Sequence, residues 1–344
     1  MKNILILGGY SKINLNWIEN MNEIFSENYN THIVKYDNWF NELDMNYDIE
    51  IEKIYKLIKE NNITNIIAKS IGIYLIVELL KKYPIKINNI IFIGYPLKVL
   101  QEKNIDITYD IVAINKKYTL FFIEQENDIL CSYNELINLF KDINAIKVNG
   151  SDHSYSNYDD IKMITNEIIE NNIKTIIHNK ENLNNKDINE LVIRTKGLII
   201  NDKNEILIAK EKNIFEFPGG HLEENETLKD CLKREILEET GISLNNSEIN
   251  NYFFKVIYKN KDYPSIGKNK MCEIYYYIIK TNKTPDLTKL KLTEMEKQNN
   301  FSVKFYKLDE IIKVLLDNLD KDVRNYAITP DMILAIEEYL NNID

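Results

Sequence analysis

The spacing of hydrophobic residues in the first half of the chain predicts alternating strands and helices. Short apolar runs, typical of buried strands, occupy residues 2–7, 32–36, 65–68, 89–94, 120–124 and 145–148. Segments with helical periodicity cover residues 15–25, 49–59, 71–83 and 161–178. Strands that alternate with helices favour a parallel sheet with helices on its faces. We therefore predict an α/β domain over residues 1–178.

The second half has a different order of elements. Strand patterns occur at residues 191–200, 205–210, 252–258, 272–280 and 302–306, with helices at 308–316 and, opened by Pro330, at 331–341. Between the halves, residues 179–189 are polar and aperiodic, as in a linker. The prediction is a second domain over residues 190–344, joined to the first by this linker.

Three acidic residues of the second domain share one face of a predicted helix. Glu235, Glu238 and Glu239 are spaced i, i+3, i+4, so their carboxylates leave the helix together. The opposite, buried face is expected to contain Leu228, Cys231, Leu232, Ile236 and Leu237. Crowded carboxylates repel one another unless a cation lies between them. Oxygen ligands without His or Cys suit Mg²⁺ or Mn²⁺ rather than Zn²⁺.

The residues around this helix resemble a known family. From Gly220 to Ile242 the sequence reads G-x5-E-x7-R-E-I-x-E-E-x-G-I, which is similar to the signature of the Nudix hydrolases at every fixed position. The preceding Phe217-Pro218-Gly219 resembles the approach to that signature. The resemblance implies an α/β/α sandwich with a mixed sheet. It also implies metal-dependent hydrolysis of a phosphoanhydride in a nucleoside diphosphate linked to another moiety.

The same resemblance implies roles for individual residues. Metal ligands would be Glu235, Glu238 and Glu239, with the Gly220 carbonyl and Glu226 as supplementary candidates, and Glu238 and Glu239 would also act in catalysis. Arg234 would orient a carboxylate without binding metal. An additional acid could come from Glu294 or Glu296, although exposed loop acids are the simpler interpretation. Among Tyr275, Tyr276 and Tyr277, one could stack on a base, but ordinary strand packing is the favoured alternative.

A second motif lies where the third strand of the first domain meets its helix. Ala68-Lys69-Ser70-Ile71-Gly72 resembles the G-x-S-x-G nucleophile elbow of α/β-hydrolases, with Ala replacing the first Gly. Asp128 and His153 follow later strands in the order Ser, acid, His. This resemblance implies Ser70 as nucleophile, His153 as base and Asp128 as the acid that orients it. The alternative is a decayed site in a scaffold or ligand-binding domain.

Composition narrows the classes of partner. The chain has 344 residues and a net charge of −10, which disfavours non-specific binding to nucleic acid. Three separated cysteines indicate a reducing compartment rather than a disulfide framework. No apolar run reaches the length of a membrane span. We expect a cytoplasmic protein with a small nucleotide substrate, and the sequence does not address its oligomeric state.

Three functional hypotheses follow from the two motifs. The first is a metal-dependent phosphoanhydride hydrolase with a second, serine hydrolase site. The second is an esterase or acyl hydrolase in the first domain, with the Nudix domain sensing a nucleotide. In the third, both sites only bind ligands.

Overall fold

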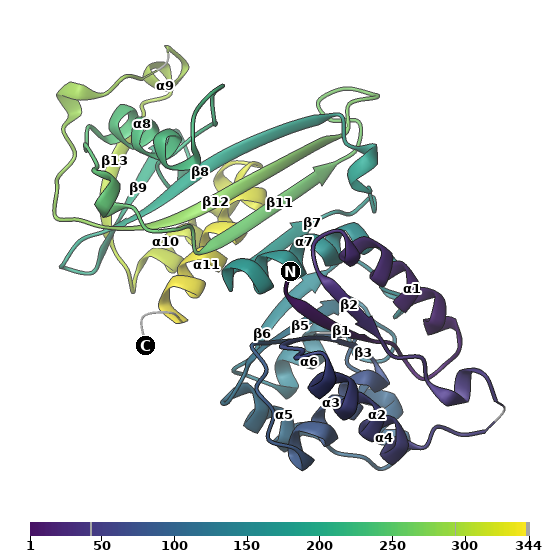
Figure 1. Cartoon of the computed structure of the whole chain (residues 1–344). Coiled ribbons are helices and arrows are strands. Elements are labelled where there is room, and N and C mark those ends of the chain that lie inside the picture. Colours follow the sequence, from purple (N-terminus) through teal and green to yellow (C-terminus); the bar gives the residue numbers. More distant parts are fainter. Residues whose placement is uncertain (42, 293, 342–344) are drawn as a thin grey trace. The chain divides into compact units, whose positions relative to one another are not determined.

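A computed structural model describes residues 1–41, 43–292 and 294–341. The chain divides into two compact units, Met1–Asp187 and Ile188–Asp344, and the division falls within the polar segment 179–189. Each unit has a core of its own, built around a sheet (Figure 1). One sheet is parallel and the other is mixed, which confirms the α/β architecture predicted from the hydrophobic pattern.

The sheet of the first unit has the order β2-β1-β3-β4-β5-β6, and every pair of neighbours is parallel. Its strands are β1 (Asn3–Leu7), β2 (Asn30–Ile33), β3 (Asn65–Lys69), β4 (Asn89–Ile93), β5 (Thr119–Gln125) and β6 (Asn144–Val148). The helices are α1 (Ile13–Ser26), α2 (Tyr47–Glu60), α3 (Ile71–Lys82), α4 (Leu97–Glu102), α5 (Thr108–Asn115), α6 (Tyr133–Leu139) and α7 (Tyr158–Asn171). The central strands are buried along their length, because helices cover the sheet.

The prediction of one helix over residues 161–178 is wrong in its last part. Helix α7 ends at Asn171, and Asn172 takes the left-handed conformation, with φ 54°, that commonly terminates helices. Residues Lys174–His178 then form strand β7. Thr175, Ile176 and Ile177 are β-branched, and such residues favour strands over helices.

The second unit contains a mixed sheet in the order β10-β9-β8-β12-β11, with β13 also paired to β9. Strands β8 (Glu190–Ile200) and β12 (Lys270–Lys280) pair in parallel over eleven residues, and the other pairs are antiparallel. The remaining strands are β9 (Glu205–Glu211), β10 (Ile214–Glu216), β11 (Phe254–Asn260) and β13 (Ser302–Lys307). The helices are α8 (Leu228–Thr240), α9 (Glu294–Gln298), α10 (Ile311–Asp317) and α11 (Asn325–Asn341).

Helix α11 begins at Asn325, five residues before the predicted start at Pro330. A proline within a helix removes one backbone hydrogen bond, and packing can offset that loss. Met332, Ala335, Ile336 and Tyr339 recur with helical spacing and are buried, so the helix is held by its apolar face. None of the described helices is long and apolar enough to cross a membrane.

Candidate active sites

Helix α8 is anchored at both ends and along one face. The Thr227 hydroxyl accepts a hydrogen bond from the Asp230 N–H at 3.2 Å and caps the first turn. Gly241 ends the helix in the left-handed conformation, with φ 71°. The buried face consists of Cys231, Leu232, Ile236 and Thr240, whereas the predicted Leu228 and Leu237 are only half-buried. This packing leaves the acidic face free to line a cavity.

A pocket of about 440 Å³ contains all three acids of the predicted metal site. Glu235, Glu238 and Glu239 line it together with Gly219 and Gly220. A Cβ atom on residue 220 would lie 2.5 Å from the Glu235 carboxylate, so any larger residue would displace this carboxylate from its present position. The Gly219 N–H donates to Glu239 Oε2 at 3.0 Å and orients that carboxylate.

Arg234 is the positive partner of the acidic face. Its guanidinium donates to both oxygens of Glu226, at 2.7 and 2.9 Å, and to Glu235 Oε1 at 2.7 Å. Glu238 Oε2 lies 3.5 Å from the same guanidinium. These contacts agree with the orienting role that the resemblance implies for Arg234. They also direct both oxygens of Glu226, a supplementary ligand candidate, toward Arg234.

Burial shifts the pKa values of two of these acids. Burial raises the pKa of Glu239 to about 7, against the opposing effect of Lys196. Burial also raises the pKa of Glu235, although the hydrogen bond from Arg234 lowers it. In both cases the ionised form is disfavoured by lost hydration. A cation in the pocket would remove this penalty.

The donor atoms of this pocket determine whether a divalent cation fits. Within residues 1–41, 43–292 and 294–341, no group of three or more His, Cys, Asp or Glu side chains converges closely enough to hold a metal ion as it stands. The donors are nevertheless carboxylate oxygens that share one pocket, and such oxygen ligands suit Mg²⁺ or Mn²⁺. Binding would require Glu235 and Glu238 to turn from Arg234 toward the cation.

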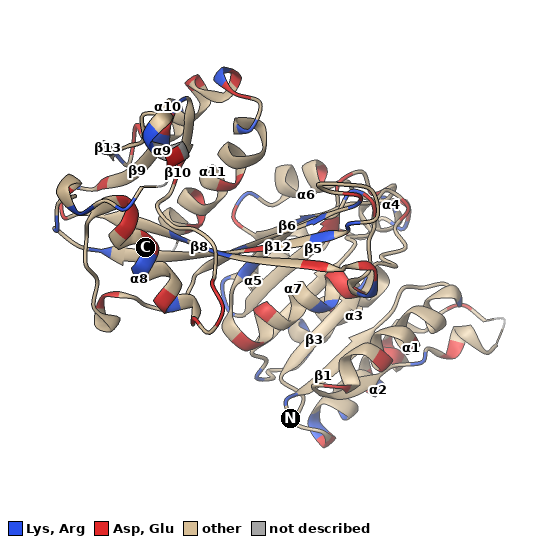
Figure 2. Cartoon of the chain, turned by 90° about the horizontal axis from the view of Figure 1, so that it is seen from above, with Lys and Arg blue, Asp and Glu red and all other residues tan. Residues whose placement is uncertain are grey.

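Sequence reasoning missed a group of charged residues beside the acids. Lys196 Nζ donates to Glu216 Oε2 and to the Gly219 carbonyl, both at 2.7 Å. Arg194 Nε donates to His221 Nε2 at 3.0 Å, and burial lowers the pKa of His221 to about 4, which keeps it neutral. The available signal was in strand β8, where Arg194 and Lys196 interrupt an apolar run. Basic and acidic residues are interspersed throughout the unit (Figure 2).

A second pocket of about 400 Å³ is lined partly by residues that also line the first. Arg194, Lys196, Glu216 and Phe217 line both. Its other walls are largely aromatic and apolar and include Tyr258, Tyr263, Ile274, Tyr276 and Met332.

The candidate tyrosines have different surroundings. Tyr276 reaches the second pocket, Tyr277 is in the core, and Tyr275 packs edge-on against Tyr252. Of the two acids proposed outside the signature, Glu294 is exposed and paired with Lys297 at 2.7 Å. The side chain of Glu296 lies outside the described residues.

In the first unit, Ser70 connects strand β3 directly to helix α3. Its backbone has φ 53° and ψ −121°, a region that residues other than glycine rarely occupy. The Ser70 N–H donates to the Ile93 carbonyl at 3.0 Å, which ties the turn to the end of β4. Strain of this kind presents a side chain at a tight strand-to-helix turn. The preceding Lys69 is buried, and burial lowers its pKa to about 8.

Asp128 and His153 meet at the ends of strands β5 and β6. His153 Nδ1 lies 2.8 and 3.0 Å from the two carboxylate oxygens of Asp128, and the Leu130 N–H donates to Oδ1 at 2.8 Å. Burial alone raises the pKa of Asp128, but the hydrogen bond from His153 holds it below its ordinary value. The order and placement of these two residues predicted this contact.

His153 also lies near the strand end that holds Ser70. A Cβ atom on Gly94, which has φ 63°, would be 2.8 Å from His153 Cε1, and Gly94 follows the Ile93 carbonyl that binds Ser70. His153 Nε2 is buried and has no hydrogen-bond partner. Within the described part of the chain, the Ser70 hydroxyl therefore does not bond to His153. Asp128 and His153 of the predicted triad are therefore in contact. Ser70 is bonded through its backbone to the end of strand β4, which His153 also approaches.

Comparison with known proteins assigns residues 192–328 to the NUDIX domain family. An 8-oxo-dGTP diphosphatase of Buchnera aphidicola subsp. Schizaphis graminum is 44% identical over 54 residues, covering 14% of this chain and 41% of that protein. Its counterpart in Buchnera aphidicola subsp. Acyrthosiphon pisum is 56% identical over 32 residues, covering 9% and 26%. A crystal structure of a MutT protein from Bacillus halodurans has 21% identity and a TM-score of 0.26, covering 36% of this chain and 72% of its own.

The chain therefore contains a NUDIX domain at residues 192–328, which confirms the family predicted for its C-terminal part. The alignments span less than half the length of each Buchnera relative. The resemblance of residues 1–178 to α/β-hydrolases stays a prediction.

Proposed function

We propose that the second unit hydrolyses a phosphoanhydride in a nucleoside diphosphate derivative, with Mg²⁺ or Mn²⁺ as cofactor. The observation that carries the proposal is the shared pocket of Glu235, Glu238 and Glu239 within a NUDIX domain. When bound, a divalent cation would polarise the diphosphate and lower the pKa of the attacking water. Glu235, Glu238 and Glu239, with the Gly220 carbonyl, would hold it.

Residues of the two pockets would also accept the proton of the attacking water and bind the substrate. Glu238 or Glu239 takes the proton of the attacking water, because both carboxylates line the pocket that would hold the cation. Arg194 and Lys196 lie at both pockets and face the anionic part of the substrate. The aromatic second pocket, with Tyr276, accepts the nucleoside. The Buchnera relatives are described as 8-oxo-dGTP diphosphatases, so oxidised purine nucleotides are the first substrates to test.

The test is the formation of nucleoside monophosphate from a panel of nucleotide sugars, dinucleotides and oxidised nucleotides, with and without EDTA. Glu239→Gln keeps the shape of the side chain and removes its charge, so turnover should fall on the order of 10²-fold or more. Glu310→Gln, on an exposed acid outside both pockets, serves as the matched control. Wild-type turnover by Glu239→Gln would contradict the assignment.

A second candidate function belongs to the first unit. The observation that favours it is the strained backbone of Ser70 together with the 2.8 Å contact between His153 and Asp128. In this proposal His153 Nε2 takes the proton of the Ser70 hydroxyl, which attacks an acyl carbonyl, and Asp128 holds the imidazole in the required tautomer. The backbone N–H of Ile71, with one from Gly9 or Tyr10, supports the oxyanion.

A fluorophosphonate probe tests this serine hydrolase directly. The wild type should be labelled, and Ser70→Ala should not be, because the probe reacts with an activated serine. His153→Ala should be labelled much more slowly. Exposed Ser26→Ala is the control for loss of an ordinary serine. Equal labelling of the wild type and Ser70→Ala would leave the first unit as a scaffold or binding domain.

A further inference from the structure

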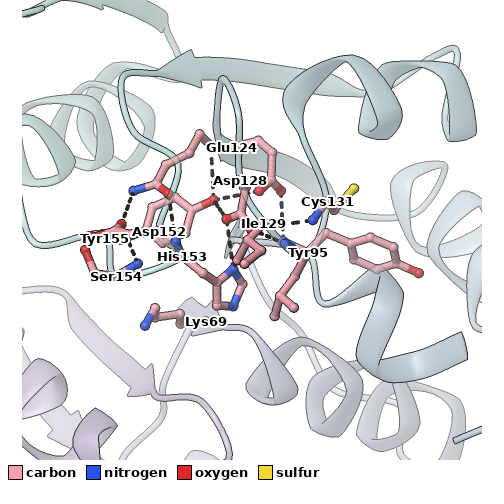
Figure 3. A network of polar contacts seen from close by, with 12 residues as sticks. Lys69, Tyr95, Glu124, Asp128, Ile129, Cys131, Asp152, His153, Ser154 and Tyr155 are labelled. Carbon is pink, nitrogen blue, oxygen red and sulfur yellow. Dashed lines mark hydrogen bonds and ion pairs between the residues drawn. The ribbon is translucent and has the colours of Figure 1, made fainter. Parts of the chain in front are cut away.

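One phenol hydroxyl behind the Asp128–His153 pair contacts two carboxyl groups. Tyr155 Oη lies 2.6 Å from Glu124 Oε1 and 2.7 Å from Asp128 Oδ2 (Figure 3). The Gln125 N–H donates to the same oxygen at 3.0 Å. A phenol has a single hydrogen and can donate to only one carboxyl group. The other short contact therefore needs a hydrogen from the second carboxyl group.

The surroundings of the two acids show which one carries that hydrogen. Asp128 accepts hydrogen bonds from His153 Nδ1 and from the Leu130 N–H, and these donors stabilise a carboxylate. Glu124 is fully buried and has no ion pair among the described residues. The Tyr95 N–H donates to its other oxygen, Oε2, at 2.8 Å. A buried carboxyl group without a cation favours its neutral form.

We propose that Glu124 is a neutral carboxylic acid that donates to Tyr155, and that Tyr155 in turn donates to Asp128 and fixes this carboxylate against His153. The inference rests on the proposed serine hydrolase function of the first unit. Glu124 and Tyr155 act as positioning residues, because they reach the reacting serine only through Asp128 and His153. Asp128 is then the single anion of the group.

Two further observations agree with this arrangement. Burial raises the pKa of Glu124 well above its ordinary value and the Asp128 carboxylate adds to this rise, although the contact with Tyr155 opposes it. The backbone of Tyr155 is held by Trp17, whose Nε1 donates to the Tyr155 carbonyl at 3.0 Å. The phenol ring is 2% exposed, so its hydroxyl has little freedom to bond elsewhere.

Infrared spectroscopy of the full-length protein tests the protonation of Glu124. At about pH 8 ordinary carboxyl groups are ionised, so a neutral carboxyl C=O band comes from a strongly perturbed acid. The wild type should show such a band, and Glu124→Gln should lose it. Glu239→Gln is the matched control for the buried acid of the other unit and should retain the band. A band that is absent, or unchanged in Glu124→Gln, would overturn the proposal.

The histidine ring signals test the positioning role. The chain has four histidines, so the NMR signal of His153 can be assigned with His153→Ala. Glu124→Gln can donate its amide N–H to Tyr155 and accept from the Tyr95 N–H, so the Nδ1–H signal of His153 should not move. Tyr155→Phe removes the donor to Asp128, so the hydrogen bond between the Asp128 carboxylate and His153 Nδ1 should strengthen, and the Nδ1–H signal should move downfield. A shift of similar size in Glu124→Gln would show that Glu124 is an anion and would overturn the proposal.

Labelling of Ser70 connects this arrangement to function. Misplacement of Asp128 in Tyr155→Phe should slow fluorophosphonate labelling about 10-fold or more, given the strength of hydrogen bonds to charged groups. Circular dichroism shows whether this variant folds, and if it does not, the infrared and NMR results on Glu124→Gln still decide the proposal. A wild type without any labelling would contradict the hydrolase function alone, because the protonation of Glu124 is measured without turnover.

Discussion

Glu239 lies in a pocket where its neighbours decide its protonation state. Burial favours the neutral acid, while Lys196 and the Gly219 N–H favour the carboxylate. The result is a pKa of about 7, raised from an ordinary 4.5. The backbone of Ser70 is likewise held in an unfavourable state, because the surrounding sheet and helix maintain its strained φ and ψ. In both units, the residues proposed for chemistry are the ones that the fold holds in an unfavourable state.

The raised pKa of Glu239 predicts how stability depends on pH. Between about pH 4.5 and 7 the folded state binds more protons at this site than the unfolded state, so the free energy of unfolding should decrease as pH rises. The decrease should be about 1–3 kcal/mol and should level off above pH 7. Thermal unfolding in EDTA across this range measures it.

Two comparisons show whether Glu239 causes this pH dependence of stability. Glu239→Gln cannot ionise and should lack most of the decrease. Mg²⁺ at pH 8 should raise the unfolding temperature of the wild type, because it binds the ionised carboxylates of the folded state. A pH dependence that is the same in the wild type and in Glu239→Gln would show that Glu239 is not the group responsible.

Helix α8 performs two tasks with its two faces. Its apolar face packs into a cluster that includes Ile199, Leu207 and Ile279, and this contact sets the position of the acids on the opposite face. Helix α3 has a similar relation to Ser70, which it holds at its first turn. The ends of these helices, where backbone groups lack helical partners, are the sensitive points.

Loss of the Thr227 cap should weaken helix α8. Thr227→Ala removes the acceptor of the Asp230 N–H and should cost about 1 kcal/mol of stability in the second unit. Thr227→Ser retains the hydroxyl and is the matched control. Urea unfolding compares the variants. Equal stability of Thr227→Ala and Thr227→Ser would mean that the cap contributes nothing measurable.

At the scale of the whole molecule, each proposed site lies within one compact unit. Ser70, Asp128 and His153 belong to Met1–Asp187, whereas the acids of α8 belong to Ile188–Asp344. Both pockets described for the second unit are lined only by residues of that unit. The two proposed chemistries should therefore be separable.

Reciprocal variants of the full chain test this separation. Ser70→Ala should leave phosphoanhydride hydrolysis within about twofold of the wild type, and Glu239→Gln should leave fluorophosphonate labelling equally unaffected, because independent sites give additive effects. The double variant should lack both activities. A loss of phosphoanhydride hydrolysis in Ser70→Ala would show that the first unit takes part in the acidic site of the second unit.

The sequence by itself determined the features that depend on local spacing. Continuous apolar runs indicate strands that are buried on both faces, and helical spacing indicates which face of a helix is buried, so the parallel strands and helix α8 could be predicted. The i, i+3, i+4 spacing of Glu235, Glu238 and Glu239 likewise determined that these acids share a face. The signature that begins at Gly220 identified the NUDIX domain because its residue types stand at fixed separations. Local pattern was a poorer guide where elements end, as at Asn172 and Pro330, because a cap or a buried face decides the boundary.

Only the tertiary structure decided which distant residues meet. Glu124 and Tyr155 are 31 residues apart, and no local pattern shows that one hydroxyl joins them to Asp128. Arg194 and Lys196 belong to the acidic site of the second unit because strand β8 passes beside the segment at Gly219. Arg194 bonds to His221 there, and Lys196 bonds to the Gly219 carbonyl. The pKa values of Glu239 and His221 are also tertiary properties, since burial by neighbouring elements causes the larger part of each shift. Spacing along the chain determines which side chains share a face, whereas packing determines what they face and how they are charged.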